Sequence, residues 1–298
     1  MTTAIDIMKN EQRKAFTLIR GDCFEEIKLL ENNSIHAVIT DPPYGSIEFR
    51  PDQIEKMRSG KGGIWRLPPS FDSSTRKPLP RFSNLTPKEK IGIQDYFEKF
   101  AKILLPKVVP GGHIVISTQV LLSSRVQIGI ENGGFEFRGQ IIRVYKTMRG
   151  GDRPKFAEKV MKDLQVSLRG HHEPWLVFRR PLQDGLLVKD NIAKWNAGAL
   201  KRIEEDKPFA DVIYCGVTPK KEREISGHPT TKSQDLMRKL VRLVVLNDDN
   251  LILDPFMGSG STIAAAKFLG ISSIGIEIDA GFFENAENSI ESLSKIGI

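Results

Sequence analysis

Two short segments of the chain carry the side chains best suited to chemistry, and each directly follows an apolar run. They are Asp41-Pro42-Pro43-Tyr44-Gly45 and the glycine-rich segment Asp254–Gly260. In the first, the Asp41 carboxylate and the Pro42 carbonyl can accept the two N–H groups of an exocyclic amine, whose lone pair is otherwise delocalised into its ring. The Tyr44 ring can stack on a planar base. The second segment lets the backbone approach a bound small molecule closely.

Each segment also has an interpretation without chemistry. Asp-Pro-Pro-Tyr is equally typical of a turn that leaves a strand, and Gly258-Ser259-Gly260 is typical of strand–helix turns in many nucleotide-binding folds. The glycine-rich segment departs from the dinucleotide fingerprint, because Ile263 occupies the place of the third glycine. This departure argues against a nicotinamide cofactor, whose pyrophosphate the full fingerprint would bind. The two segments together, in this order, are far more specific than either alone.

Composition and charge narrow the class of protein. The chain has 298 residues, of which 40% are apolar and 27% charged, as is usual for a soluble globular protein. Its net charge of +7 favours a polyanionic partner. No apolar run reaches the ~18 residues that a membrane span requires, and the first ten residues lack the core of a signal peptide. We therefore expect a cytoplasmic protein that does not enter a membrane.

Metal and disulfide chemistry have little support in the sequence. Cys23 and Cys215 are too few for a disulfide framework and have no metal-ligand spacing. His171-His172-Glu173 has a metal-like composition, but adjacent residues on a strand point to opposite faces. We interpret these three as rim or structural residues and expect no metal site.

The hydrophobic pattern alternates between strands and helices. We expect strands at residues 16–19, 35–40, 113–117, 135–145, 173–178, 250–253 and 273–278. Helical spacing covers residues 24–30, 87–105, 121–130, 235–246, 262–269 and 282–293. The second of these helices begins with a capping box from Thr86 to Glu89. The alternation predicts an α/β fold with a doubly wound, mostly parallel sheet and helices on both faces.

Three segments interrupt this pattern. Ser46–Lys90 contains six prolines and an excess of positive charge, Lys146–Gly170 is basic, and Pro181–Arg223 has no strong period. A structureless loop as long as the first is usually functional or disordered. The two basic segments are candidates for contacts with phosphates.

Further motifs extend over most of the chain. A predicted helix is preceded by Gly227-His228-Pro229-Thr230-Thr231-Lys232, and the last predicted strand has an acidic end within Gly275–Asp279. The first predicted strand is followed by Gly21-Asp22-Cys23, and the strand at 113–117 is preceded by Pro110-Gly111-Gly112. With the two segments above, these motifs resemble those of the amino-methyltransferases that modify an exocyclic nitrogen of a DNA base. Ser233 is a departure, because that family usually has proline there. The base segment comes first and the cofactor segment last, a permuted order similar to that of the beta class.

The resemblance implies a seven-stranded, Rossmann-like methyltransferase sheet whose last strand is antiparallel. Residues 173–178 would be that strand. Residues 1–180 and 226–298 would form the two parts of the catalytic domain, with the basic segments as insertions, and residues 181–225 would be the target-recognition region.

The resemblance also implies the residues of the site. Those implied to hold the base and act in catalysis are Asp41, Pro42, Pro43 and Tyr44. Those implied to bind S-adenosyl-L-methionine are Asp22, Cys23, Thr230, Lys232, Asp254, Pro255, Phe256, Gly258, Ser259, Gly260 and Glu277. Asp254 would accept from the methionine ammonium and Glu277 from the ribose hydroxyls. Asp22 would meet the adenine amino group and Lys232 the methionine carboxylate, although a turn residue and a solvated charge are equally open interpretations of these two.

The activity implied is site-specific methylation of adenine N6 in double-stranded DNA, with the base flipped out of the duplex. The aspartate at the head of the first segment favours adenine, because the similar cytosine-N4 enzymes more often carry serine there. The alternatives are cytosine-N4 methylation, methylation of RNA or of a protein glutamine, and an inactive nucleic-acid-binding partner with the same fold. A homodimer and a cognate restriction endonuclease are further partners that the family admits, in a bacterial, archaeal or phage-encoded setting.

Overall fold

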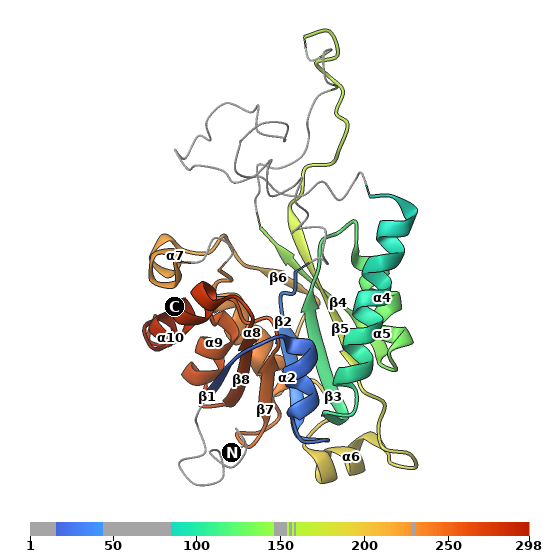
Figure 1. Cartoon of the computed structure of the whole chain (residues 1–298), viewed down its shortest axis with the longest axis vertical. Coiled ribbons are helices and arrows are strands. Elements are labelled where there is room, and N and C mark those ends of the chain that lie inside the picture. Colours follow the sequence, from blue (N-terminus) through green and yellow to red (C-terminus); the bar gives the residue numbers. More distant parts are fainter. Residues whose placement is uncertain are drawn as a thin grey trace.

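One eight-stranded sheet runs through the computed structural model, which describes residues 16–43, 85–145, 154, 157, 159–227 and 231–297. The strands are β1 (Phe16–Arg20), β2 (Ile35–Thr40), β3 (Val108–Ser117), β4 (Glu136–Val144), β5 (His172–Arg179), β6 (Val212–Tyr214), β7 (Leu251–Asp254) and β8 (Ser272–Glu277). They lie in the order β1-β8-β7-β2-β3-β5-β4-β6 (Figure 1). β5 is antiparallel to both of its neighbours, and the other pairs of this sheet are parallel.

Helices cover both faces of the sheet. One face packs against α2 (Cys23–Leu29), α4 (Pro87–Leu104) and α5 (Ser123–Asn132). The other face packs against α8 (Gln234–Val244) and α9 (Ser261–Phe268), and α10 (Ala280–Ser294) packs on α9. The described part of the chain also contains α6 (Val188–Trp195) and α7 (Lys220–Ser226). None of the described helices is long and apolar enough to cross a membrane.

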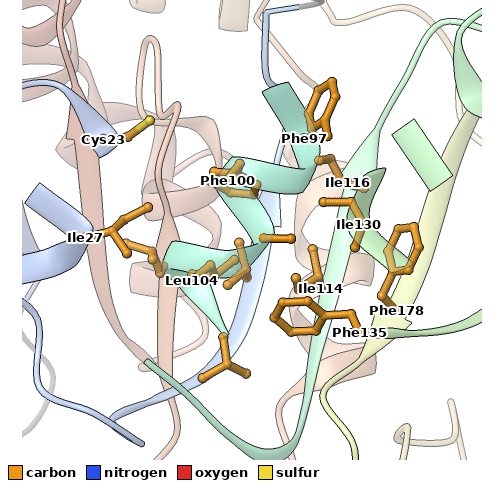
Figure 2. Close-up of a cluster of buried hydrophobic side chains, with 14 of the residues drawn as sticks. Cys23, Ile27, Phe97, Phe100, Leu104, Ile114, Ile116, Ile130, Phe135 and Phe178 are labelled. Atoms are coloured by element: carbon orange, nitrogen blue, oxygen red, sulfur yellow. The ribbon is translucent and has the colours of Figure 1, made fainter. Parts of the chain in front are cut away.

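The buried sequence of β2 explains why helices are needed on both sides. Ala37 and Ile39 belong to the cluster with α8 and α9, whereas Val38 belongs to the cluster with α4. Figure 2 shows the second of these clusters, where Phe97 and Phe100 of α4 lie over the sheet. Successive strand residues point to opposite faces, so an unbroken apolar strand must be covered twice. Each large apolar side chain buried in this way contributes about 1.5–3 kcal/mol.

The start of α4 follows from local sequence alone. Glu89 N donates to Thr86 Oγ1 at 3.3 Å, and Thr86 N donates to the Glu89 carboxylate at 2.8 Å, so the predicted capping box is confirmed. Pro87 occupies the first turn, where a missing N–H breaks no helical hydrogen bond. Residues 44–84 and most of 146–158 lie outside the described residues, so the functions predicted for the two basic segments stay predictions there.

The structure confirms the predicted doubly wound α/β fold, and it confirms the antiparallel strand, which is β5. The described sheet has eight strands where seven were expected. The additional strand, β6, pairs in parallel with β4 at the edge of the sheet. It has three residues, too few to show a period, and it lies in the segment Pro181–Arg223, for which no helix or strand was predicted.

β2 and β7 form the switch point of the sheet. From β7 the chain passes through α9 to β8 on one side, and from β2 it passes through α4 to β3 on the other. Loops that leave the carboxyl ends of such a pair diverge and open a crevice where α/β proteins bind ligands. Asp41 follows β2 and Asp254 ends β7. Because β2 and β7 are neighbouring parallel strands, both predicted segments lie at the same edge of the sheet.

Candidate active site

The two predicted segments are joined directly by side chains. β2 and β7 pair with Val38 beside Leu253. Two residues onward, Thr40 Oγ1 donates to Asp254 Oδ1 at 2.7 Å. The hydroxyl of Thr262, in the first turn of α9, donates to Asp254 Oδ2 at 2.5 Å. These bonds fix the segment after β2 against the segment after β7.

Asp254 carries a buried carboxylate at the carboxyl end of β7. Its burial raises the pKa to about 6, although the hydrogen bonds from Thr262, Thr40 and the Phe256 N–H lower it in part. Both carboxylate oxygens therefore already serve as structural acceptors. The contact predicted between Asp254 and a methionine ammonium stays a prediction.

The glycine-rich segment lies against the end of β8. Gly258 and Gly260 have φ values of 51° and 77°, in the left-handed region that favours glycine. Gly258 N donates to Glu277 Oε2 at 2.9 Å, and Asp279 N donates to Oε1 at 2.8 Å. Burial raises the pKa of the Glu277 carboxyl, while these N–H donors lower it. A β-carbon on Gly260 would lie 2.6 Å from Cγ1 of Ile290, so the segment packs directly on α10.

The loop after β1 borders the same edge. Gly21 N donates to the Glu277 carbonyl at 3.0 Å, which places Asp22 beside the end of β8. Asp22 is exposed and caps α2 by accepting from Phe24 N at 2.9 Å. The Cys23 thiol lies in the core, and burial raises its pKa to about 12. A contact between Cys23 and a cofactor would therefore come from its backbone.

This set of residues fits S-adenosyl-L-methionine. Glu277 and Asp22 present carboxylates suited to the hydroxyl and amino donors of a nucleoside. Half-buried Phe256 packs on Phe100, with 5.6 Å between ring centroids, and forms an apolar wall. Pro255 and Ser259 are buried within the glycine-rich turn, and their predicted contacts with the cofactor stay predictions.

The carboxylate of Asp41 belongs to a cluster of charged side chains. Lys232 Nζ lies 2.9 Å from Asp41 Oδ2 and 2.5 Å from Glu173 Oε1. Arg143 of β4 lies 3.1 Å from the other Glu173 oxygen, which also accepts from Trp175 Nε1 at 3.3 Å. The side chain of Asp41 is 26% exposed and that of Arg143 only 6%, so the cluster runs from the edge of the sheet into the core.

Glu173 is ionised at the centre of this cluster. Burial by itself would raise the pKa of Glu173, but Lys232 and Arg143 outweigh that effect and lower it to about 2. The Ser117 hydroxyl, at the end of β3, adds a long contact of 3.5 Å. Side chains from β3, β4, β5 and the segment before α8 therefore converge behind Asp41.

Sequence reasoning missed Glu173 and Arg143. Glu173 was interpreted as a rim or structural residue with its two histidines, although one signal was available. A glutamate that opens the apolar strand His172–Arg179, across from an arginine in the predicted hairpin, indicates a buried ion pair, and Arg143 is indeed its register partner. Lys232 contacts Asp41 of the base segment in the structure, and its predicted contact with the cofactor carboxylate stays a prediction here.

Two predicted site residues, Tyr44 and Thr230, lie outside the described residues. Pro42 is buried and Pro43 is half-buried at the end of β2, so the backbone that carries Asp41 is held by its surroundings. In the part of the chain that the structure describes, no three His, Cys, Asp or Glu side chains form a group that could hold a metal ion.

The fold and this arrangement define a class of protein, and sequence comparison names the family. The chain belongs to the N6/N4 DNA methylase family, whose profile matches residues 35–288. It is 26% identical over 301 residues to the Type II methyltransferase M.HindIII of Haemophilus influenzae, covering 92% of this chain and 94% of that protein. It is 23% identical over 282 residues to the Type II methyltransferase M2.DpnII of Streptococcus pneumoniae, covering 92% and 89%.

Solved structures share the fold. The M1.HpyAVI–SAM complex matches with a TM-score of 0.56 and 21% identity over 93% of this chain and 99% of that one. The PvuII DNA methyltransferase, described as cytosine-N4-specific, matches with a TM-score of 0.56 and 17% identity over 94% and 92%. The chain is therefore a DNA amino-methyltransferase by family.

Proposed function

We propose that this chain transfers a methyl group from S-adenosyl-L-methionine to the exocyclic N6 of adenine in double-stranded DNA. The observation that supports this most strongly is the position of Asp41. Its carboxylate stands at the switch point of the sheet, joined through Thr40 and Asp254 to the glycine-rich segment. The nitrogen to be methylated and the methyl donor would therefore meet between the two segments.

The reaction needs acceptors for the amine protons. Delocalisation into the ring makes the exocyclic nitrogen a poor nucleophile, and two acceptors favour the pyramidal form whose lone pair can attack. Asp41 accepts one N–H and the Pro42 carbonyl the other, and the ring of Pro42 fixes the direction of its backbone. The bound cofactor supplies an electrophilic methyl group, so positioning and exclusion of water govern the rate.

The substrate base must leave the duplex, because its amino group cannot be reached inside the stack. Tyr44, the last residue of Asp41-Pro42-Pro43-Tyr44, is proposed to stack on the extruded base. The residues proposed to hold the cofactor are Asp22, Cys23, Thr230, Asp254, Pro255, Phe256, Gly258, Ser259, Gly260 and Glu277. Lys232 was expected among them, but its Nζ lies 2.9 Å from Asp41 Oδ2. Residues 1–180 and 226–298 are proposed as the catalytic domain and residues 181–225 as the target-recognition region.

Adenine is preferred over cytosine because of Asp41, since the similar cytosine-N4 enzymes more often carry serine at this position. The fold is shared by a cytosine-N4-specific enzyme and does not separate the two bases. The test is to express the chain in cells without adenine or cytosine methylation and to analyse the nucleosides of their DNA by mass spectrometry. N6-methyldeoxyadenosine is expected. N4-methyldeoxycytidine would overturn the choice of base, and the absence of both would support an inactive partner protein.

A further inference from the structure

We infer that Lys232, held by Glu173 and Arg143, is a positioning residue for the Asp41 carboxylate and is not a ligand of the cofactor. This inference rests on the proposed role of Asp41 in activating the amine. It departs from the expectation that Lys232 binds the methionine carboxylate, and it adds Glu173 to the machinery of the site.

The geometry assigns a separate task to each oxygen of Asp41. Lys232 Nζ engages Oδ2 at 2.9 Å. Among the described residues, Oδ1 has no hydrogen-bond partner, so it is the oxygen that can accept an incoming N–H. A carboxylate on a short side chain would otherwise rotate about χ2, since that torsion is broad. The ammonium group fixes this rotation and keeps one oxygen directed to the amine.

Glu173 fixes the lysine in turn. Its Oε1 lies 2.5 Å from Lys232 Nζ, and its Oε2 accepts from both Arg143 and Trp175. Arg143 is itself anchored by donating to the carbonyls of Cys215 and Gly216. A lysine alone is a flexible point charge, whereas this one is fixed by a carboxylate that is only 13% exposed and that the sheet holds in place.

Charge balance argues against a role at the cofactor carboxylate. The four side chains Asp41, Glu173, Lys232 and Arg143 carry −1, −1, +1 and +1, which sum to zero. A further carboxylate at Lys232 would leave this partly buried cluster with one uncompensated negative charge, which is unfavourable in a site of low polarity.

The experiment compares Lys232→Met, Lys232→Arg, Glu173→Gln and the double variant Lys232→Met/Glu173→Gln. Lys239→Met serves as the control, because Lys239 forms a similar pair with Asp235 on the exposed side of α8. Two quantities are measured for each protein: the single-turnover rate of methyl transfer at saturating DNA and cofactor, and the dissociation constant of the cofactor by calorimetry. The double variant keeps the net charge of the cluster, so it remains informative if a single variant folds poorly.

Lys232→Met is expected to slow single turnover about 10- to 150-fold, the equivalent of one hydrogen bond to a charged group, and to change cofactor affinity by less than about threefold. Lys232→Arg should recover most of the rate. Glu173→Gln should slow the reaction less than Lys232→Met, and the double variant should be no slower than Lys232→Met, because Glu173 acts through Lys232.

The inference would be overturned if Lys232→Met kept an unchanged rate at saturating cofactor while its affinity for the cofactor fell more than about tenfold. That result would indicate that Lys232 binds the methionine carboxylate. Independent, multiplicative effects in the double variant would overturn the part assigned to Glu173. Asp41→Ala separates the two proposals. An active Asp41→Ala enzyme contradicts the proposed function, whereas an inactive one beside a fully active Lys232→Met enzyme contradicts only the positioning role.

Discussion

Replacement of Glu277 by alanine is expected to weaken cofactor binding and to leave DNA binding nearly unchanged. The Glu277 carboxylate accepts from Gly258 N and Asp279 N in the structure, and its proposed ligands are the two ribose hydroxyls. A hydrogen bond to a charged group contributes about 1.5–3 kcal/mol, so losing one net bond raises the dissociation constant about 10- to 150-fold. The release of Gly258 N loosens the glycine-rich segment and moves the expected loss toward the upper end.

Isothermal titration calorimetry with S-adenosyl-L-methionine measures this loss, and DNA affinity is measured in parallel. Glu277→Gln keeps one carbonyl oxygen as an acceptor and should lose less than Glu277→Ala. The control is Glu284→Ala, which removes the same charge from an exposed position on α10. If Glu277→Ala binds the cofactor as tightly as the unaltered protein, the end of β8 does not lie at the ribose and the cofactor site has been placed wrongly.

Three further predictions concern other parts of the site. The pKa of Asp254 is raised from 3.8 to about 6 in the folded protein, so the folded state binds a proton more tightly than the unfolded state. Ionisation of Asp254 therefore lowers the free energy of unfolding as pH rises from 4 to 6, by about 3 kcal/mol for a shift near two pH units. Chemical denaturation of Asp254→Asn should show a smaller decrease in the free energy of unfolding over that interval. An equal decrease in both proteins would contradict the raised pKa of Asp254. Tyr44→Phe should keep most methylation activity, because stacking uses the ring, whereas Tyr44→Ala should lose roughly 1–3 kcal/mol; an equal loss in both would give the hydroxyl a role. Neutralising Lys56, Arg58 and Lys61 together should flatten the dependence of log DNA affinity on log salt by about 0.9 for each phosphate that these side chains no longer neutralise, and an unaltered slope would mean that these charges only solvate their segment.

Local sequence determines the parts of the fold that were predicted. Residues 35–40 are mostly apolar, with Ala37, Val38 and Ile39 in succession, and such a run favours a strand covered on both faces. The start of α4 is fixed by Thr86, Pro87 and Glu89, which need no distant partner. β6 was missed because an edge strand of three residues carries no period, and it is defined by its pairing with β4.

The site residues likewise divide into those that local sequence predicts and those that depend on tertiary contacts. Asp41 and Glu277 could be predicted as site residues because Asp41 directly follows β2 and Glu277 ends β8, each within a recognisable motif. The cluster behind Asp41 could not be derived in the same way, since Lys232, Glu173 and Arg143 come from three separate segments that only the folded sheet brings together. Lys232 was recognised as a site residue, but the identity of its partner depends on tertiary geometry.

The central claim is that Asp41 serves the methyl transfer and not the binding of the cofactor. The most direct test is the single-turnover transfer of a labelled methyl group by Asp41→Ala, with the cofactor dissociation constant measured on the same preparation. We predict loss of detectable transfer while cofactor affinity stays within about threefold of the unaltered protein, because the residues proposed to hold the cofactor do not include Asp41. Transfer at a rate close to that of the unaltered enzyme, or loss of cofactor binding in a well-folded Asp41→Ala protein, would contradict the account.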